Sequence, residues 1–167
     1  LAIVTRAKLK LWPEPEETVT ILFGFNTIED AVNLTEDCMS TNTEIVACEL
    51  FFQKGVDLVR DAYDLQPLWG NKNSIYLLCE FAGDSGISDR LSENILGEIL
   101  QTHNSVLVAT TDRERQRLWQ YRELHTVAVS RKGIPLKLDV TIPLGNLPHF
   151  LDGIDTICGN INPLSLP

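Results

Sequence analysis

The chain has 167 residues, 44% of them hydrophobic, and its 14 lysines and arginines stand against 23 acidic residues, for a formal charge of −9. This length fits one globular domain with a substantial apolar core. The negative charge repels nucleic-acid phosphates and anionic lipid headgroups, so we expect neither as a partner. No stretch reaches the ~20 apolar residues of a membrane span, which predicts a protein without a transmembrane segment.

The first half of the chain predicts strands separated by helices. In chain order we expect a strand at 2–11, a strand at 18–25, a helix opened by Asn26-Thr27 and Asp30, a strand at 45–52, a helix ending near Asp64 and a strand at 74–82. Residues 74–82 (SIYLLCEFA) are too apolar to have a solvated face. They therefore predict an interior strand of the sheet.

The second half continues the same mixture. We expect a helix behind Ser88 that runs to Leu100, a strand at 105–110, one long helix at 111–131, a strand at 135–142 and a helix from Asn146. Short connections suit hairpins and the longer ones contain helices. The order predicts the α+β class, with a ferredoxin-like antiparallel or mixed sheet and helices mainly on one face.

The cysteines and histidines predict no metal site in this chain. Cys38, Cys48, Cys79 and Cys158 include no C-x-x-C pair, and the three histidines lack metal-binding spacing. Cys48 and Cys79 lie inside apolar runs, where a small buried thiol in a reducing compartment is the expected role. We therefore expect a cytoplasmic protein, or a mitochondrial one in a eukaryote.

The most informative segment runs from Trp119 to Pro143 (WQYRELHTVAVSRKGIPLKLDVTIP). Arg122 and Thr126 are four residues apart, which places them on the same helix face, and a turn at Gly133 would return Lys137 along that helix. An arginine fork, a lysine and a hydroxyl suit a small carboxylate. The alternative is that both cations form surface ion pairs, Arg122 with an acid and Lys137 with Asp139 or Glu123.

Two acids and two tryptophans could each have a structural or a functional role. Glu49 and Glu80 lie inside apolar strands, where each is either an acid–base group with a raised pKa or, as we favour, on the solvent side of an edge strand. Trp69 and Trp119 are expected at the core or its rim. No glycine-rich phosphate loop or serine-hydrolase motif is present, and Gly83–Gly86 is expected to be a turn.

Three stretches resemble the FAD-linked oxidases and dehydrogenases of the vanillyl-alcohol-oxidase type, including D-2-hydroxyglutarate dehydrogenase, D-lactate dehydrogenase and the glycolate oxidase flavin subunit. LAIVTRAKLKLWPEP looks like the exit from a flavin domain, SIYLLCEFAG is similar to a family strand, and W-x-x-R-E with K-x-D-V-x-I-P is the most specific match. The resemblance covers nearly the whole chain and implies that residues 1–167 are the substrate (cap) domain. Both chain ends look cut from a longer protein, so we expect the flavin-binding domain and a C-terminal histidine-rich segment to be absent here.

The resemblance implies that Arg122, Thr126 and Lys137 bind the substrate carboxylate, while no catalytic residue lies in this fragment. FAD would be bound mainly by the absent domain and would accept a hydride from a D-2-hydroxy acid, leaving the 2-oxo acid. A divalent metal such as zinc would bind to the histidine-rich segment. Further partners implied are an electron-acceptor protein or quinone and a second copy in a homodimer.

Two alternatives to the enzyme remain open at this point. A ferredoxin-like sheet also serves non-catalytic binding or regulatory modules, because a fold does not fix a function. An assembly domain whose acidic surface contacts a redox partner subunit is the third interpretation. A glycine-rich flavin domain upstream in the gene would favour the enzyme.

Overall fold

The described residues form a four-stranded antiparallel sheet. A computed structural model describes residues 3–40, 45–69, 73–93, 99, 105–135 and 137–161. The strands are β1 (Glu17–Phe25), β2 (Ile45–Phe52), β3 (Ile75–Gly83) and β4 (Val106–Ala109), in the spatial order β2-β3-β1-β4. Each neighbouring pair is antiparallel, so the predicted α+β class and ferredoxin-like sheet are confirmed.

The two interior strands are those whose side chains are mainly apolar on both faces. Strand β1 pairs with β3 along its whole length, with Ile21 opposite Cys79. Six of the nine residues of β3 have buried side chains, and all of these are apolar except for Tyr76. Residues 74–82 are therefore interior, as predicted. Strands β2 and β4 form the two edges, where Val46 and Val108 are exposed.

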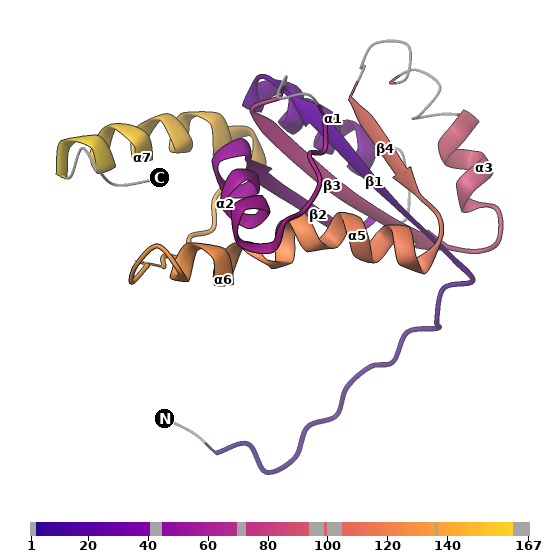
Figure 1. Cartoon of the computed structure of the whole chain (residues 1–167). Helices are drawn as coiled ribbons and strands as arrows, with labels where there is room; N and C mark the ends of the chain where they lie inside the picture. The colour runs from indigo at the N-terminus through magenta and orange to yellow at the C-terminus, as the bar shows by residue number, and fades with distance from the viewer. Residues whose placement is uncertain are drawn as a thin grey trace.

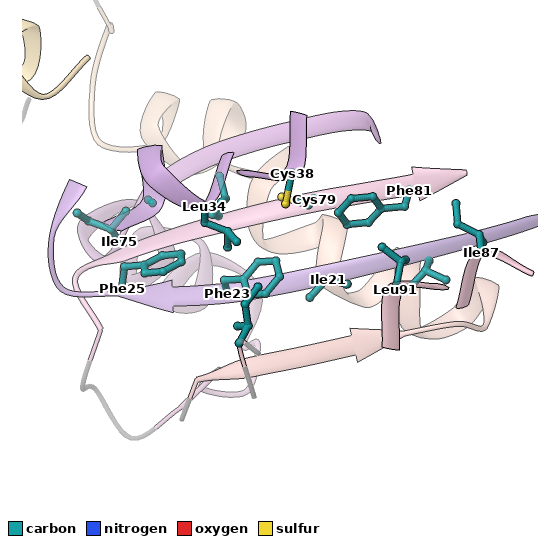
Figure 2. Close-up of a cluster of buried hydrophobic side chains, with 14 residues drawn as sticks. Ile21, Phe23, Phe25, Leu34, Cys38, Ile75, Cys79, Phe81, Ile87 and Leu91 are labelled. Atoms are coloured by element: carbon teal, nitrogen blue, oxygen red, sulfur yellow. The ribbon is translucent and has the colours of Figure 1, made fainter. Parts of the chain in front are cut away.

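One face of the sheet is covered by α1 (Ile28–Ser40) and α3 (Ile87–Leu91). Figure 2 shows Phe23, Phe25 and Phe81 projecting from β1 and β3 into this apolar layer. The predicted start of α1 is confirmed, since the Asp30 N–H donates to Thr27 Oγ1. Half of the helix predicted behind Ser88, residues 94–98 and 100, lies outside the described residues.

The other face is covered by α2 (Gln53–Tyr63) and α5 (Asp112–Glu123) (Figure 1). The expectation of helices mainly on one face is therefore wrong: β1 and β3 also direct Leu22, Tyr76 and Leu78 away from α1, and this second apolar surface needs its own cover. Leu118 and Tyr121 of α5 supply part of that cover.

The helix predicted at 111–131 is two helices. Thr111 and Glu114 form a complete capping box at the start of α5. The helix then breaks at Leu124, and α6 (His125–Ser130) follows. At this break the His125 ring Nδ1 lies 3.0 Å from the Arg122 carbonyl oxygen and donates a hydrogen bond to it. In a continuous helix that carbonyl would accept only from a backbone N–H.

Two predicted strands are not formed in the described residues. Residues 3–15 run away from the sheet as an exposed arm (Figure 1), and residues 137–143 are coil that is exposed except at the half-buried Ile142. Leu138 is 74% exposed and Val140 61% exposed. Alternation creates an apolar face but cannot supply the neighbouring backbone that a strand requires.

The last described segment is helical. A 3-10 turn, η2 (Leu144–Asn146), leads into α7 (Leu147–Ile161), which confirms the helix predicted from Asn146. Among the described helices, none combines the length and apolarity that crossing a membrane requires.

Candidate functional site

Arg122 lies in the last turn of α5 and reaches the edge strand β2. Its Nε donates to Glu49 Oε2 at 2.8 Å, and both side chains are about one third exposed, at 37% and 36%. Arginine has five N–H donors, and this bond uses one of them. The pairing fixes the position of the guanidinium while both terminal nitrogens stay outside this bond.

The neighbouring motif residue Trp119 makes a parallel connection one helical turn earlier. Trp119 Nε1 donates to Glu80 Oε2 at 2.8 Å, and Thr20 Oγ1 donates to the same oxygen at 2.8 Å. The W-x-x-R spacing therefore places two N–H donors on one face of α5. They bind carboxylates on adjacent strands, which fixes α5 to the sheet.

Arg122 also lines an open cleft of about 600 Å³, the α2–α6 cleft, between those two helices and the end of β2. Its apolar wall consists of Leu50, Phe51, Phe52, Leu58 and Val129. The charged lining residues are Lys54, Asp57, Arg122 and Lys132. Asp57 already accepts a hydrogen bond from Gln53 and pairs with Arg60 at 3.5 Å. The cleft is therefore cationic with an apolar wall, a combination suited to a small organic anion.

His125 closes one side of the α2–α6 cleft. The ring packs edge-on against Phe51, with ring centroids 5.4 Å apart, and it contacts Gly55 so closely that a Cβ at that position would clash. Nδ1 donates to the Arg122 carbonyl, whereas the buried Nε2 has no hydrogen-bond partner among the described residues. Burial lowers the pKa of His125, so the neutral ring is favoured.

The three residues predicted to bind carboxylate are not gathered in this cleft. Arg122 lines it, but Thr126, on α6, is exposed and is not among the lining residues. Lys137 is exposed on the coil beyond Gly133, because the strand expected to carry it is not formed. Arg122 does form an ion pair with an acid, Glu49, as the alternative of surface ion pairs expected, whereas neither Asp139 nor Glu123 forms an ion pair with Lys137 in the described structure.

Sequence reasoning named Glu49 and Glu80 but missed the donors that bind them, and it missed Lys54 and Lys132. Glu80 is on interior β3, so its assignment to an edge strand is wrong, whereas Glu49 does lie on the edge strand β2. The available signal was that a carboxylate within an apolar strand needs a donor. Trp119 and Arg122, one helical turn apart, are the matching donors. Lys54 and Lys132 carried no such signal, because only the contact between α2 and α6 brings them together.

The described residues contain no cluster suited to a metal ion, and the Gly83–Gly86 turn is not open to a phosphate group. No set of three or more His, Cys, Asp or Glu side chains in the described ranges is arranged to hold a metal ion. In the expected turn near Gly83, the Gly86 N–H donates to Asp84 Oδ1 and Arg90 pairs with the same carboxylate at 2.8 Å. That turn is closed by its own side chains rather than open as an amide cradle.

The chain is similar to one protein family and to two dehydrogenases. The family model described as "FAD linked oxidases, C-terminal domain" matches residues 14–162. The mitochondrial D-2-hydroxyglutarate dehydrogenase of Rattus norvegicus is 28% identical over 166 residues, which cover 95% of this chain and 30% of that protein. The D-2-hydroxyglutarate dehydrogenase of Stutzerimonas stutzeri is 25% identical over 171 residues, 98% of this chain and 35% of that protein. The chain thus spans about a third of the length of these relatives.

Proposed function

The chain belongs to the family of C-terminal domains of FAD-linked oxidases, and on that premise we propose that it is the substrate-side domain of an FAD-dependent dehydrogenase that oxidises a D-2-hydroxy acid. FAD would be bound mainly by a separate flavin domain of the same protein. When bound, it would supply the two-electron acceptor for the conversion of the C2 hydroxyl into a 2-oxo group. A divalent metal, if the whole protein uses one, would bind outside the described residues.

The observation that carries this proposal is the hydrogen bonding of Arg122. Glu49 binds its Nε and holds the guanidinium beside the apolar wall of the α2–α6 cleft, while the bond leaves the two terminal nitrogens for a second carboxylate. A bidentate pair of this kind fixes both the position and the orientation of a small acid. Orientation matters because the C2 hydrogen must face the acceptor.

Four other residues are further candidates for binding the substrate carboxylate in this proposal. Lys137 would add a point charge and Thr126 a hydroxyl donor once the coil that carries Lys137 is held by a neighbouring domain. Lys54 and Lys132, which line the cleft, are additional candidates for the carboxylate. The catalytic base would come from outside this chain.

The decisive experiment compares an acid with its neutral analogue in a protein that carries both domains. We expect Arg122→Ala to lower kcat/KM for a D-2-hydroxy acid by a factor equivalent to about 2–4 kcal/mol. The same variant should leave kcat/KM for the corresponding 2-hydroxy amide nearly unchanged, because the amide has no charge to lose. Lys137→Ala should show the same selectivity with a smaller loss, and Thr126→Val a loss of about 1 kcal/mol.

Glu49→Gln is the matched control for a purely structural role of Arg122. If the ion pair only holds α5 to β2, then Arg122→Ala and Glu49→Gln should lower the melting temperature and both kcat/KM values to similar extents. A loss confined to the acid substrate in Arg122→Ala, with a smaller and unselective loss in Glu49→Gln, supports carboxylate binding. Equal losses for acid and amide in Arg122→Ala would contradict it.

The competing function, a non-catalytic binding or regulatory module, is separated by absorbance. We expect the whole protein to show flavin absorbance that a panel of D-2-hydroxy acids bleaches, and the isolated 167-residue chain to purify colourless. Bleaching by D-2-hydroxyglutarate would agree with the names of the two relatives. An unbleached flavin would favour the module, and a yellow isolated chain would move the flavin site into this domain.

The cellular setting follows from the same proposal. The electrons would leave to an acceptor protein or a quinone, and the enzyme could work as a homodimer. We expect an intracellular enzyme, mitochondrial in a eukaryote, in keeping with the mitochondrial rat relative.

A further inference from the structure

Three cysteine sulfurs meet on the face of the sheet opposite to the α2–α6 cleft. Cys48 of β2 and Cys79 of β3 are direct cross-strand partners, and their sulfurs lie 3.7 Å apart. Cys38 of α1 lies next to Cys79 within the apolar layer (Figure 2). The described cluster is not arranged to hold a metal ion. Its chemistry is therefore that of closely spaced thiols.

Exposure distinguishes the three sulfurs. Cys38 and Cys79 are both 0% exposed, whereas Cys48 lies on the edge strand and is exposed. A dissolved oxidant would therefore reach Cys48 first. The expectation of a buried Cys48, based on its apolar run, is wrong, because the edge position leaves one side of β2 open.

The surroundings of Cys48 favour its thiolate, which is the nucleophilic form. Hydrogen bonding by the Cys79 thiol, supported by the Thr35 hydroxyl at 3.7 Å, lowers the pKa of Cys48 from its usual 9.0 to about 7, against opposing effects of burial and of the Glu49 charge. Hydrogen bonds with Cys38 and with Cys48, together with burial, raise the pKa of Cys79. Two thiols of unlike acidity are thus paired across the strands, and only the more acidic one is exposed.

We propose that Cys48 and Cys79 form a peroxide-sensitive pair, in which Cys48 is oxidised first and Cys79 completes a reversible disulfide. The Cys48 thiolate attacks a hydroperoxide, so its sulfur gains an oxygen as sulfenic acid and the peroxide leaves as an alcohol or water. The Cys79 sulfur then displaces that oxygen, an S–S bond forms, and the Cys79 proton leaves with the oxygen as water. The two thiols lose two electrons and one peroxide is reduced.

The strand geometry permits this bond without unfolding. Directly opposed residues of antiparallel strands have Cα atoms about 4.5–5.5 Å apart, within the range of about 4.4–6.8 Å found in disulfides. Rotation of the side chains must shorten the sulfur separation from 3.7 Å to about 2.05 Å. Cys38 is a competing neighbour of Cys79, but its complete burial in the α1 layer keeps it from the first oxidation step.

The test is a disulfide map of the peroxide-treated chain. After treatment with hydrogen peroxide and blocking with N-ethylmaleimide, digestion with trypsin and glutamyl endopeptidase separates the three cysteines into peptides 37–44, 45–49 and 73–80. We expect peptide 45–49 linked to peptide 73–80, with the link lost on reduction. A link between 37–44 and 73–80, or no link at all, would overturn the proposal.

Variants separate the two steps. Cys48→Ser, at an exposed position, should abolish the link and leave Cys79 reduced, whereas Cys38→Ser should keep the link. Cys79→Ser should stop the reaction at Cys48 sulfenic acid, which dimedone traps. Should Cys79→Ser not fold, dimedone trapping at early times in the unmodified chain tests the same step. Trapping on Cys158 of α7 as fast as on Cys48 would contradict a special reactivity.

The pH dependence of alkylation provides an independent measurement. The groups that act on Cys48 among the described residues are Cys79 from β3, Cys38 and Thr35 from α1, and Glu49 on its own strand. We expect iodoacetamide to modify Cys48 with a midpoint near pH 7. At pH 7 the rate should exceed that of N-acetylcysteine about fivefold, since a larger thiolate fraction outweighs lower nucleophilicity. A midpoint near pH 9 would overturn the assignment of Cys48 as the first site.

Discussion

The two faces of the sheet use the same strands in different ways. Toward α1 and α3, strands β1 and β3 direct an apolar layer centred on Phe23 and Phe81. Toward α2 and α5 they add polar anchors to a smaller apolar cluster, since Glu80 accepts hydrogen bonds from Thr20 and Trp119. The two faces therefore contribute differently. The face toward α1 and α3 mainly stabilises the fold by hydrophobic burial, whereas hydrogen bonds on the other face fix the position of α5.

The largest expected effect is on the apolar face. Phe81 is completely buried, so Phe81→Ala should lower the free energy of unfolding by about 3–5 kcal/mol through lost burial and the cavity left behind. Phe52→Ala, at a residue 40% exposed on edge strand β2, is the control and should cost less than half as much. Urea denaturation followed by circular dichroism measures both. Similar losses of unfolding free energy in the two variants would contradict the prediction that the apolar core stabilises the fold more than the edge strand does.

Gly55 tests the close contact between α2 and α6. Gly55→Ala places a methyl group against the His125 ring, so we expect a loss of about 1–3 kcal/mol despite the better helix propensity of alanine. Gly153→Ala, in α7 with open space around it, should instead stabilise by about 0.5–1 kcal/mol. Thermal melts of both variants give the comparison. Stabilisation by Gly55→Ala would mean that His125 can move aside without cost.

Trp119→Phe tests the polar anchor of α5. The variant keeps an aromatic ring but removes the N–H that binds Glu80, so the unfolding free energy should fall by about 1–2 kcal/mol. Trp69→Phe controls for the lost ring area, because Trp69 acts by stacking on Tyr76 with ring centroids 5.9 Å apart. The Trp119 variant should be the less stable of the two in urea. Equal stabilities would show that the Glu80 hydrogen bond adds nothing measurable.

The smallest effect concerns pH and His125. Burial lowers its folded-state pKa below the usual 6.5, so below that pH the unfolded chain binds a proton that the folded chain resists. His125 therefore favours folding above about pH 6.5, and this contribution is lost as the pH falls through the folded-state pKa. His125→Gln should flatten the decline of stability between pH 7 and pH 5. Urea denaturation at several pH values in this range measures the slope, and an unchanged slope in His125→Gln would contradict the assignment to this residue.

Patterning predicted the elements whose partners lie close along the chain or whose burial is complete. The capping residues Thr27 and Thr111 fix helix starts by bonds to N–H groups three residues on, and residues 74–82 could only be interior because neither face suits water. The same patterning failed at 135–142. That segment alternates more strictly than β1, yet the described residues pair no strand with it.

The candidate site shows the same division. The sequence by itself determined that Trp119 and Arg122 lie on one helix, because their segment contains good helix formers and no glycine or proline. The common helix face predicted for Arg122 and Thr126 is interrupted, because α5 ends at Glu123 and α6 begins at His125. Only the tertiary structure decided that the partners of Trp119 and Arg122 are Glu80 and Glu49, that Lys54 and Lys132 line the cleft with Arg122, and that Cys48 meets Cys79. Each of these pairs joins residues distant in sequence. Such contacts depend on strand order and helix placement, which arise from the burial of the whole chain rather than from any local pattern.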